Sequence, residues 1–291
     1  MIALELVRKR KIRRIAALVA LIGSLGVGSL GTIAFLGRFV GTFTVSVDNG
    51  EVLLSLDEKK AFENPQSYLR INSLPVYTPV TYNELLREYP ADQLDNEETS
   101  YLLGRYVDQK GKESIQFFKY TYYVKNSGGI AARYNISFNI LESTPDNQES
   151  EPRYLDDILR VMIFDHDSED EQHDFHVYAK KTSKENYLKD GTLDTQGREF
   201  IYDPPRKTDP NDPSKELDPK LWRVESDKYQ FAETFKSGNE IASYGVQDFQ
   251  PAQIRRYTFV AWLEGSDPDC YGSVPTEASI RLGVEINAYE N

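Results

Sequence analysis

The stretch ASIRLGVEINA, residues 278–288, decides the fold. Its larger apolar residues fall at every second position, at Ile280, Leu282, Val284 and Ile286. Successive side chains of a β-strand point to opposite faces, so a period of two predicts a strand with one buried face. The same alternation recurs along much of the chain after residue 40 and predicts an all-β protein.

Further strands follow from this pattern. The alternating or continuous apolar runs are residues 43–47, 52–56, 118–124, 134–140, 159–164, 175–179 and 257–263. Asp48-Asn49-Gly50 separates the first two runs, and Asn-Gly accommodates the positive φ angles of a tight turn, so we expect a hairpin there. Short strands with turn signals between them are typical of an antiparallel β-sandwich or barrel, so we expect a fold of this class.

Two segments interrupt the strands. Thr81-Tyr82-Asn83-Glu84 has the spacing of a capping box and predicts a short helix to about Arg87. Residues 92–98 are expected to form an acidic loop. Residues 182–220 are polar and rich in Pro and Asp, which indicates a long insertion rather than a separate domain.

The N-terminal segment predicts a membrane location. Residues 1–14 carry a basic cluster, and residues 15–37 carry no charge. A helix of that length spans roughly 35 Å, enough for a hydrocarbon core of about 30 Å. Basic flanks stay in the cytoplasm, so residues 38–291 are expected outside the cell as one domain on a single-pass anchor. Cleavage near Thr32-Ile33-Ala34 and secretion is the alternative.

The composition excludes some partners. The formal net charge is −12, which argues against nucleic acid, because phosphate binding needs a basic surface. Cys270 is the single cysteine of the chain, so no disulfide forms within it. A lone cysteine beside a strand end is more often a small packed residue than a nucleophile. Asp267 and Asp269 are expected to order the turn around it.

All three histidines fall in one acidic loop, residues 165–176. Imidazole and carboxylate groups together suit zinc or another divalent metal. The candidate ligands are His166, Asp167, His173 and His176. Their spacing matches no established site, and the glycine of a calcium-binding EF-hand loop is absent. The alternative is a solvated acidic loop. No other cofactor is predicted.

The aromatic run at residues 117–123 leaves two interpretations open. Exposed aromatic rings would form a platform for carbohydrate. Aromatic residues on both faces of a strand also suit a sandwich core with a half-covered outer face, and this second interpretation is favoured.

Four stretches carry a resemblance to a known group. They are Gly31-Thr32-Ile33-Ala34-Phe35, the strand at residues 42–47, the segment at residues 122–128 and the stretch at residues 262–270. Together they resemble exported β-sandwich proteins of the camelysin/TasA type and uncharacterised membrane-anchored surface proteins of Gram-positive bacteria. The resemblance implies a jelly-roll-like sandwich and, in some members, fibres assembled by donation of an N-terminal strand.

These observations together predict a non-enzymatic cell-surface structural or interaction protein, such as a matrix or fibre component, that works through its sheet edges. Its partners would be the membrane and either further copies of itself or another surface protein. The alternative is an extracellular binding module for a divalent cation or cell-wall glycan. An enzyme is not expected, because one loop seldom holds three convergent ligands rigidly enough for metal catalysis.

Overall fold

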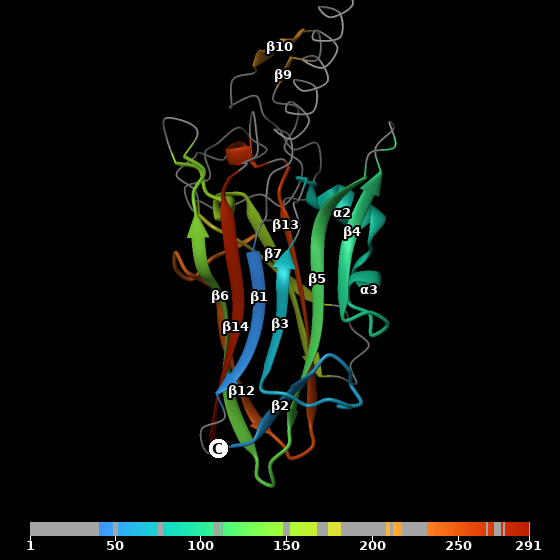
Figure 1. The fold of residues 1–291 in the computed structure, drawn as a ribbon, viewed down its shortest axis with the longest axis vertical. Coiled ribbons are helices and arrows are strands. Elements are labelled where there is room, and N and C mark those ends of the chain that lie inside the picture. Colours follow the sequence, from blue (N-terminus) through green and yellow to red (C-terminus); the bar gives the residue numbers. More distant parts are fainter. Residues whose placement is uncertain are drawn as a thin grey trace, which may run out of the picture.

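Two β-sheets packed face to face form the body of the protein in a computed structural model (Figure 1). The residues that the structure describes are 41–48, 52–74, 78–107, 111, 113–147, 152–167, 174–181, 208–209, 212–216, 232–265, 267–270, 275 and 277–290. The predicted β-sandwich is therefore confirmed at the level of its architecture.

Sheet A has five strands in the order β12-β6-β14-β1-β3. Their bounds are β1 (Gly41–Asp48), β3 (Tyr68–Leu74), β6 (Ala132–Thr144), β12 (Glu240–Phe249) and β14 (Ser279–Glu290). The alternating stretch at residues 278–288 thus contributes β14, the central strand of this sheet.

Sheet B has the order β11-β8-β7-β13-β5-β2, and β4 also pairs with β5. Its strands are β2 (Leu54–Asp57), β4 (Tyr101–Val107), β5 (Glu113–Asn126), β7 (Leu159–Asp167), β8 (Phe175–Ala179), β11 (Glu233–Thr234) and β13 (Ile254–Leu263). A separate small pair joins β9 (Thr208–Asp209) to β10 (Asp212–Glu216).

The sheets are mixed, so the expectation of a purely antiparallel sandwich is wrong. β1 runs parallel to β14, and β11 runs parallel to β8. The hairpin expected around Asp48-Asn49-Gly50 is also wrong, because β1 lies in sheet A whereas β2 pairs with β5 in sheet B. Alternation shows that both strands bury one face, but two strands facing one core from opposite sheets show the same pattern.

Aromatic side chains join the two sheets in the core. Phe43 of β1 lies 4.8 Å, centroid to centroid, from Phe259 of β13, and Phe138 of β6 stacks on the same ring at 6.1 Å. Four aromatic residues of the run at 117–123 are at most 1 % exposed, and the fifth, Tyr123, is 2 % exposed. This burial confirms that the run belongs to the core and leaves no platform for carbohydrate there.

Two short helices cover part of the outer face of sheet B (Figure 1). They are α2 (Tyr82–Glu88), with the predicted capping box between Thr81 and Glu84 in place, and α3 (Ala91–Leu94). Tyr82, Leu85 and Leu94 pack into a second apolar cluster with side chains of sheet B. Two 3₁₀ helices, Leu155–Asp157 and Pro268–Cys270, lie in connections.

Within the residues described, no helix has the length and apolar character needed to cross a membrane. The predicted spanning segment, residues 15–37, and most of the insertion at residues 182–220 lie outside the described residues.

Candidate functional site

The structure places two of the predicted metal ligands on opposite faces of sheet B. His176 is paired with Ile163, whose side chain points into the core. His166 stands three positions beyond Ile163 on β7 and so points to the outer face. The side chain of Asp167 and the whole of His173 lie outside the described residues. The four-residue metal site therefore stays a prediction.

Each of these two histidines has a carboxylate partner of its own. His176 Nδ1 lies 2.7 Å from Glu233 Oε1 at the exposed end of β11. His166 Nε2 lies 2.8 Å from Asp95 Oδ2 and is almost wholly buried. Among the described residues no group of three or more His, Cys, Asp and Glu side chains is placed to hold a metal ion.

A buried charged cluster fixes the segment after α3 to the outer face of sheet B. Arg256 of β13 donates to Asp95 at 2.9 Å and to Glu97 at 3.1 Å. Thr258, two residues on, donates to the second oxygen of Asp95 at 2.7 Å. Asp95 is fully buried, and its carboxylate is compensated by a cation and two further hydrogen-bonding groups. Such a cluster holds one geometry, because breaking it would leave a buried charge unpaired.

Glu264 plays a similar part at the start of α2. Its Oε2 accepts from the backbone N–H of Tyr82 at 3.1 Å and from Trp262 Nε1 at 3.0 Å. The first N–H groups of a helix have no partner within the helix, and a carboxylate there is favourable. Glu264 therefore attaches the helix to the sheet.

The turn around Cys270 has the structural role that the sequence predicted. Asp267 accepts from the backbone N–H of Asp269 at 2.6 Å and pairs with the buried Arg160 at 2.8 Å. Cys270 is half-buried and packs against the core. These contacts account for Asp267 and Cys270 as parts of the fold.

Besides the charged cluster, the hydroxyl groups of several tyrosines lie close together in the core. The hydroxyls of Tyr134 and Tyr257 lie 2.7 Å apart. Burial is the main cause that raises the pKa of Tyr122, Tyr244 and Tyr257 well above the usual value. Hydroxyls with raised pKa values stay protonated, so these tyrosines are neutral and do not act as bases.

The outer face of sheet A is different, since no described helix covers it. Pairing across the five strands aligns its outward side chains in three rows. The rows are Tyr68-Ser46-Glu285-Ser137-Ser243, Arg70-Thr44-Gly283-Asn139-Glu240 and Asp48-Asn287-Asn135-Gly245. With strands about 4.8 Å apart, a full row is roughly 19 Å long. We call these three rows the polar face.

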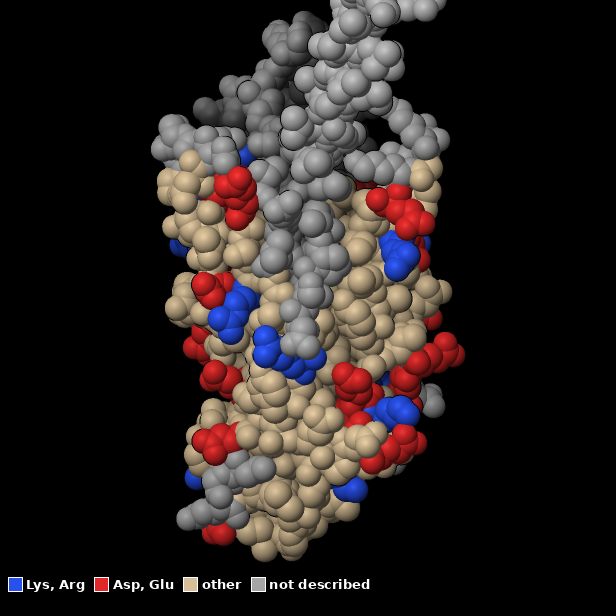
Figure 2. Space-filling model, viewed as in Figure 1, with Lys and Arg blue, Asp and Glu red and all other residues tan. Residues whose placement is uncertain are grey.

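Short uncharged polar residues dominate the polar face. Seven of the fourteen positions hold Ser, Thr or Asn, and the charged residues stand at the ends of the rows, with Glu285 as the exception. In Figure 2, which views this side of the molecule, uncharged residues fill most of the lower part, and acidic groups gather toward its margins. Three positions hold Asn, a residue that is depleted in β-strands. Residues that disfavour the local structure are often found at functional sites.

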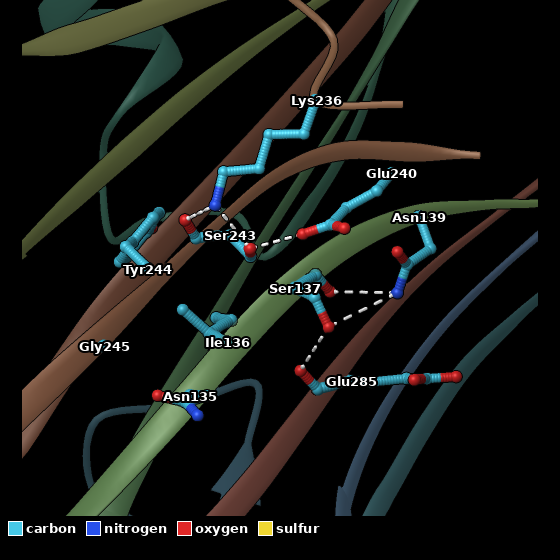
Figure 3. A pocket seen from close by; sticks show the side chains of 10 residues that line it. All are labelled: Asn135, Ile136, Ser137, Asn139, Lys236, Glu240, Ser243, Tyr244, Gly245 and Glu285. Atoms are coloured by element: carbon cyan, nitrogen blue, oxygen red, sulfur yellow. Dashed lines mark hydrogen bonds between the residues drawn. The ribbon is translucent and has the colours of Figure 1, made fainter. Parts of the chain in front are cut away.

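A shallow, open hollow of about 440 Å³ lies at the β12 side of the polar face. Figure 3 shows Asn135, Ser137 and Asn139 along β6, between Glu285 of β14 and Ser243 of β12. Lys236 and Glu240 stand at one end, and both hydrogen-bond to Ser243.

The hydrogen bonds within the hollow are long on the β6 side. Asn139 Nδ2 lies 3.4 Å from Ser137 Oγ, and Ser137 Oγ lies 3.5 Å from the carbonyl oxygen of Glu285. Bonds of this length are weak, so a ligand can replace them at little cost. Gly245 leaves space in the hollow, because a Cβ at this position would lie only 3.1 Å from Asn135 Oδ1.

Comparison with models of protein families, with curated proteins and with solved structures finds no match for this chain.

The sites predicted from the sequence include neither the polar face nor the buried charged cluster. The polar face could have been found in part, because the residues between the buried ones on β1, β6 and β14 are Ser, Thr, Asn and Gly. The cluster depends on Asp95 and Arg256, which are 161 positions apart in the chain, and no local pattern links them.

Proposed function

We propose that this chain is a non-enzymatic cell-surface binding module that holds a hydroxyl-rich ligand, with cell-wall glycan as the leading class, on the polar face of sheet A. The observation that carries the proposal is the hollow, where Asn135, Ser137 and Asn139 direct amide and hydroxyl groups to solvent along one strand. These groups donate and accept hydrogen bonds, as sugar hydroxyls also do.

The charge distribution favours a largely neutral ligand. A strongly anionic ligand would be repelled by Glu285 in the central row and by the net charge of −12. Tyr68, 46 % exposed at the β3 end of the same row, adds an aromatic surface with a polar tip. Hydrogen bonding by neutral groups, with one carboxylate and one ring, suits a sugar chain lying across the strands.

The proposed location follows the sequence. Residues 15–37 would tether the module to the cell membrane with its N-terminus in the cytoplasm, or cleavage would release it. The sandwich at residues 38–291, jelly-roll-like with its long insertion, would then stand outside the cell, where a wall polymer is within reach.

Calorimetry on the full chain in mild detergent tests the proposal with soluble peptidoglycan fragments and a neutral polysaccharide as probes. We expect saturable binding that Asn135→Ala together with Asn139→Ala weakens at least tenfold. Ser114→Ala on β5 is the matched control, because it removes a polar strand side chain from the other sheet. The absence of heat with both probes would contradict the proposal, as would equal binding by the double variant.

Self-association into a matrix or fibre is the second candidate. The observation in its favour is β1, which lies between β3 and β14 and directs Phe43 and Val45 into the core between the sheets. A neighbouring copy could supply the same strand by domain swapping. The edge strand β12 argues against assembly through that edge, because two register shifts interrupt its pairing with β6. Light scattering that shows only monomers over a wide concentration range would remove this candidate.

A further inference from the structure

We propose that Lys119 and Asn96 form an intramolecular isopeptide bond, a covalent cross-link that ties the segment after α3 to the centre of sheet B. Lys119 Nζ lies 3.1 Å from Asn96 Oδ1 and 3.1 Å from the backbone oxygen of the same residue. A C=O bond is about 1.2 Å long, so Nζ is no more than about 4.3 Å from the side-chain carbonyl carbon. This inference does not depend on the proposed function.

The fold holds the amine rigidly in this position. Lys119 is fully buried on β5, where Leu102 of β4 and Val260 of β13 stand opposite it on the two sides. In the part of the chain that the structure describes, both hydrogen bonds from Nζ go to Asn96. A long, flexible side chain is thereby directed at a single residue.

The amide is also oriented for the reaction. Asn96 Nδ2 donates to the carbonyl oxygen of Gln93 at 2.6 Å, which turns the amide oxygen toward Lys119 and the leaving nitrogen away from it. Asn96 is only half-buried, so ammonia can depart into solvent. Nucleophile and leaving group therefore lie on different sides of the carbonyl carbon.

The surroundings favour the neutral amine that attack requires. Burial is the main cause that lowers the pKa of Lys119 to about 8. Arg256 acts in the same direction, whereas Asp95 and Glu98 oppose it. With a pKa of about 8, roughly a tenth of the amine is unprotonated at pH 7.

The step is balanced without any further reactant. The lone pair of Nζ forms a bond to the carbonyl carbon, and a tetrahedral adduct results. The bond from that carbon to Nδ2 then breaks, and one proton passes from Nζ to Nδ2, so that ammonia leaves. Amides react slowly with free amines, but holding the amine against one amide raises its effective concentration far above that of an amine in solution.

Intact-mass measurement on the full chain tests the proposal. We expect the wild type to be lighter than its sequence mass by one ammonia molecule, and tandem mass spectrometry to find a branched peptide that joins residues 96 and 119. Lys119→Met and Asn96→Ala should each have their full sequence masses. Lys125→Met is the matched control, since it removes a lysine from the same strand and should keep the deficit.

Two outcomes would overturn the proposal. The first is a wild type that keeps its full sequence mass after prolonged incubation at pH 8. The second is a deficit that persists in Lys119→Met, because ammonia would then have been lost by succinimide formation at another asparagine. If Lys119→Met fails to fold, Asn96→Ala decides by the same readout, since Asn96 is half-buried and Lys119 remains in place.

The rate of cross-linking provides an independent check. In freshly synthesised protein the deficit should accumulate roughly fifty-fold faster at pH 8 than at pH 6, because the neutral fraction of an amine with a pKa of about 8 rises by about that factor. A rate that is equal at the two pH values would contradict attack by Lys119.

Discussion

The outer faces of the two sheets differ in how far their polar side chains are buried and paired. On sheet B, α2, α3 and the segment after them cover the strands, and Arg256 and Asp95 form a buried ion pair beneath them. On sheet A the polar groups of the hollow lie open, and their hydrogen bonds to one another are long. Paired, buried groups hold a fold in one arrangement, whereas loosely held, open groups are available to a ligand.

The largest expected effect comes from breaking the buried charged cluster. Arg256→Met leaves Asp95 without its cation, and we expect the free energy of unfolding to fall by about 3–5 kcal/mol. Urea unfolding measures the change. Arg281→Met is the control, because Arg281 and Glu142 form an exposed pair on sheet A, and its effect should stay below about 1 kcal/mol. Equal losses in the two variants would remove the contrast between the faces.

A smaller effect is expected at Glu264. Glu264→Ala leaves the N–H groups of Trp262 and Tyr82 without their acceptor, which costs about 1–3 kcal/mol. Glu264→Gln keeps one acceptor oxygen and should lose less. Hydrogen exchange should locate the change in α2. If exchange in α2 is unaltered in Glu264→Ala, then Glu264 does not attach the helix to the sheet.

The covered face should also show a dependence on alkaline pH. Burial is the main cause that raises the pKa of Tyr123 to about 12, whereas an unfolded tyrosine titrates near pH 10. The raised value means that its contribution to stability is complete below about pH 10 and is lost as the pH rises toward 12. Tyr123→Phe should flatten the fall in unfolding free energy over that window. An unchanged slope would show that Tyr123 does not contribute.

The smallest effect on stability is expected in the hollow. Ser137→Ala and Asn139→Ala each remove a side chain with long hydrogen bonds, so the free energy of unfolding should change by less than about 0.5 kcal/mol. The same variants should weaken binding of glycan fragments. A loss of stability above about 1 kcal/mol would indicate that these residues serve the fold instead.

The sequence predicts the local structure better than its assembly. Alternation identified β5, β6, β7, β8, β13 and β14, and the capping box identified α2. It did not assign β1 and β2 to different sheets, because a period of two reports burial but not the partner strand. β4 and β12 were not predicted, because exposed residues in the C-terminal half of each strand obscure the alternation.

The candidate site was less predictable still. The three histidines stood out because they are close in sequence, yet alternation along β7 and β8 separates His166 from His176. Ser46, Glu285, Ser137 and Ser243 are unremarkable in the sequence, and only strand pairing brings them into one row. Sites formed across a sheet depend on register, which a single sequence does not display.

The most direct test of the account is hydrogen exchange of the full chain with and without soluble peptidoglycan fragments. The account predicts that the fragments slow exchange in β6, β12 and β14 around the hollow and leave α2, α3 and β4 unchanged. Slower exchange confined to the side covered by the helices, or no change anywhere at saturating fragment, would contradict the claim that the open face of sheet A is the binding surface.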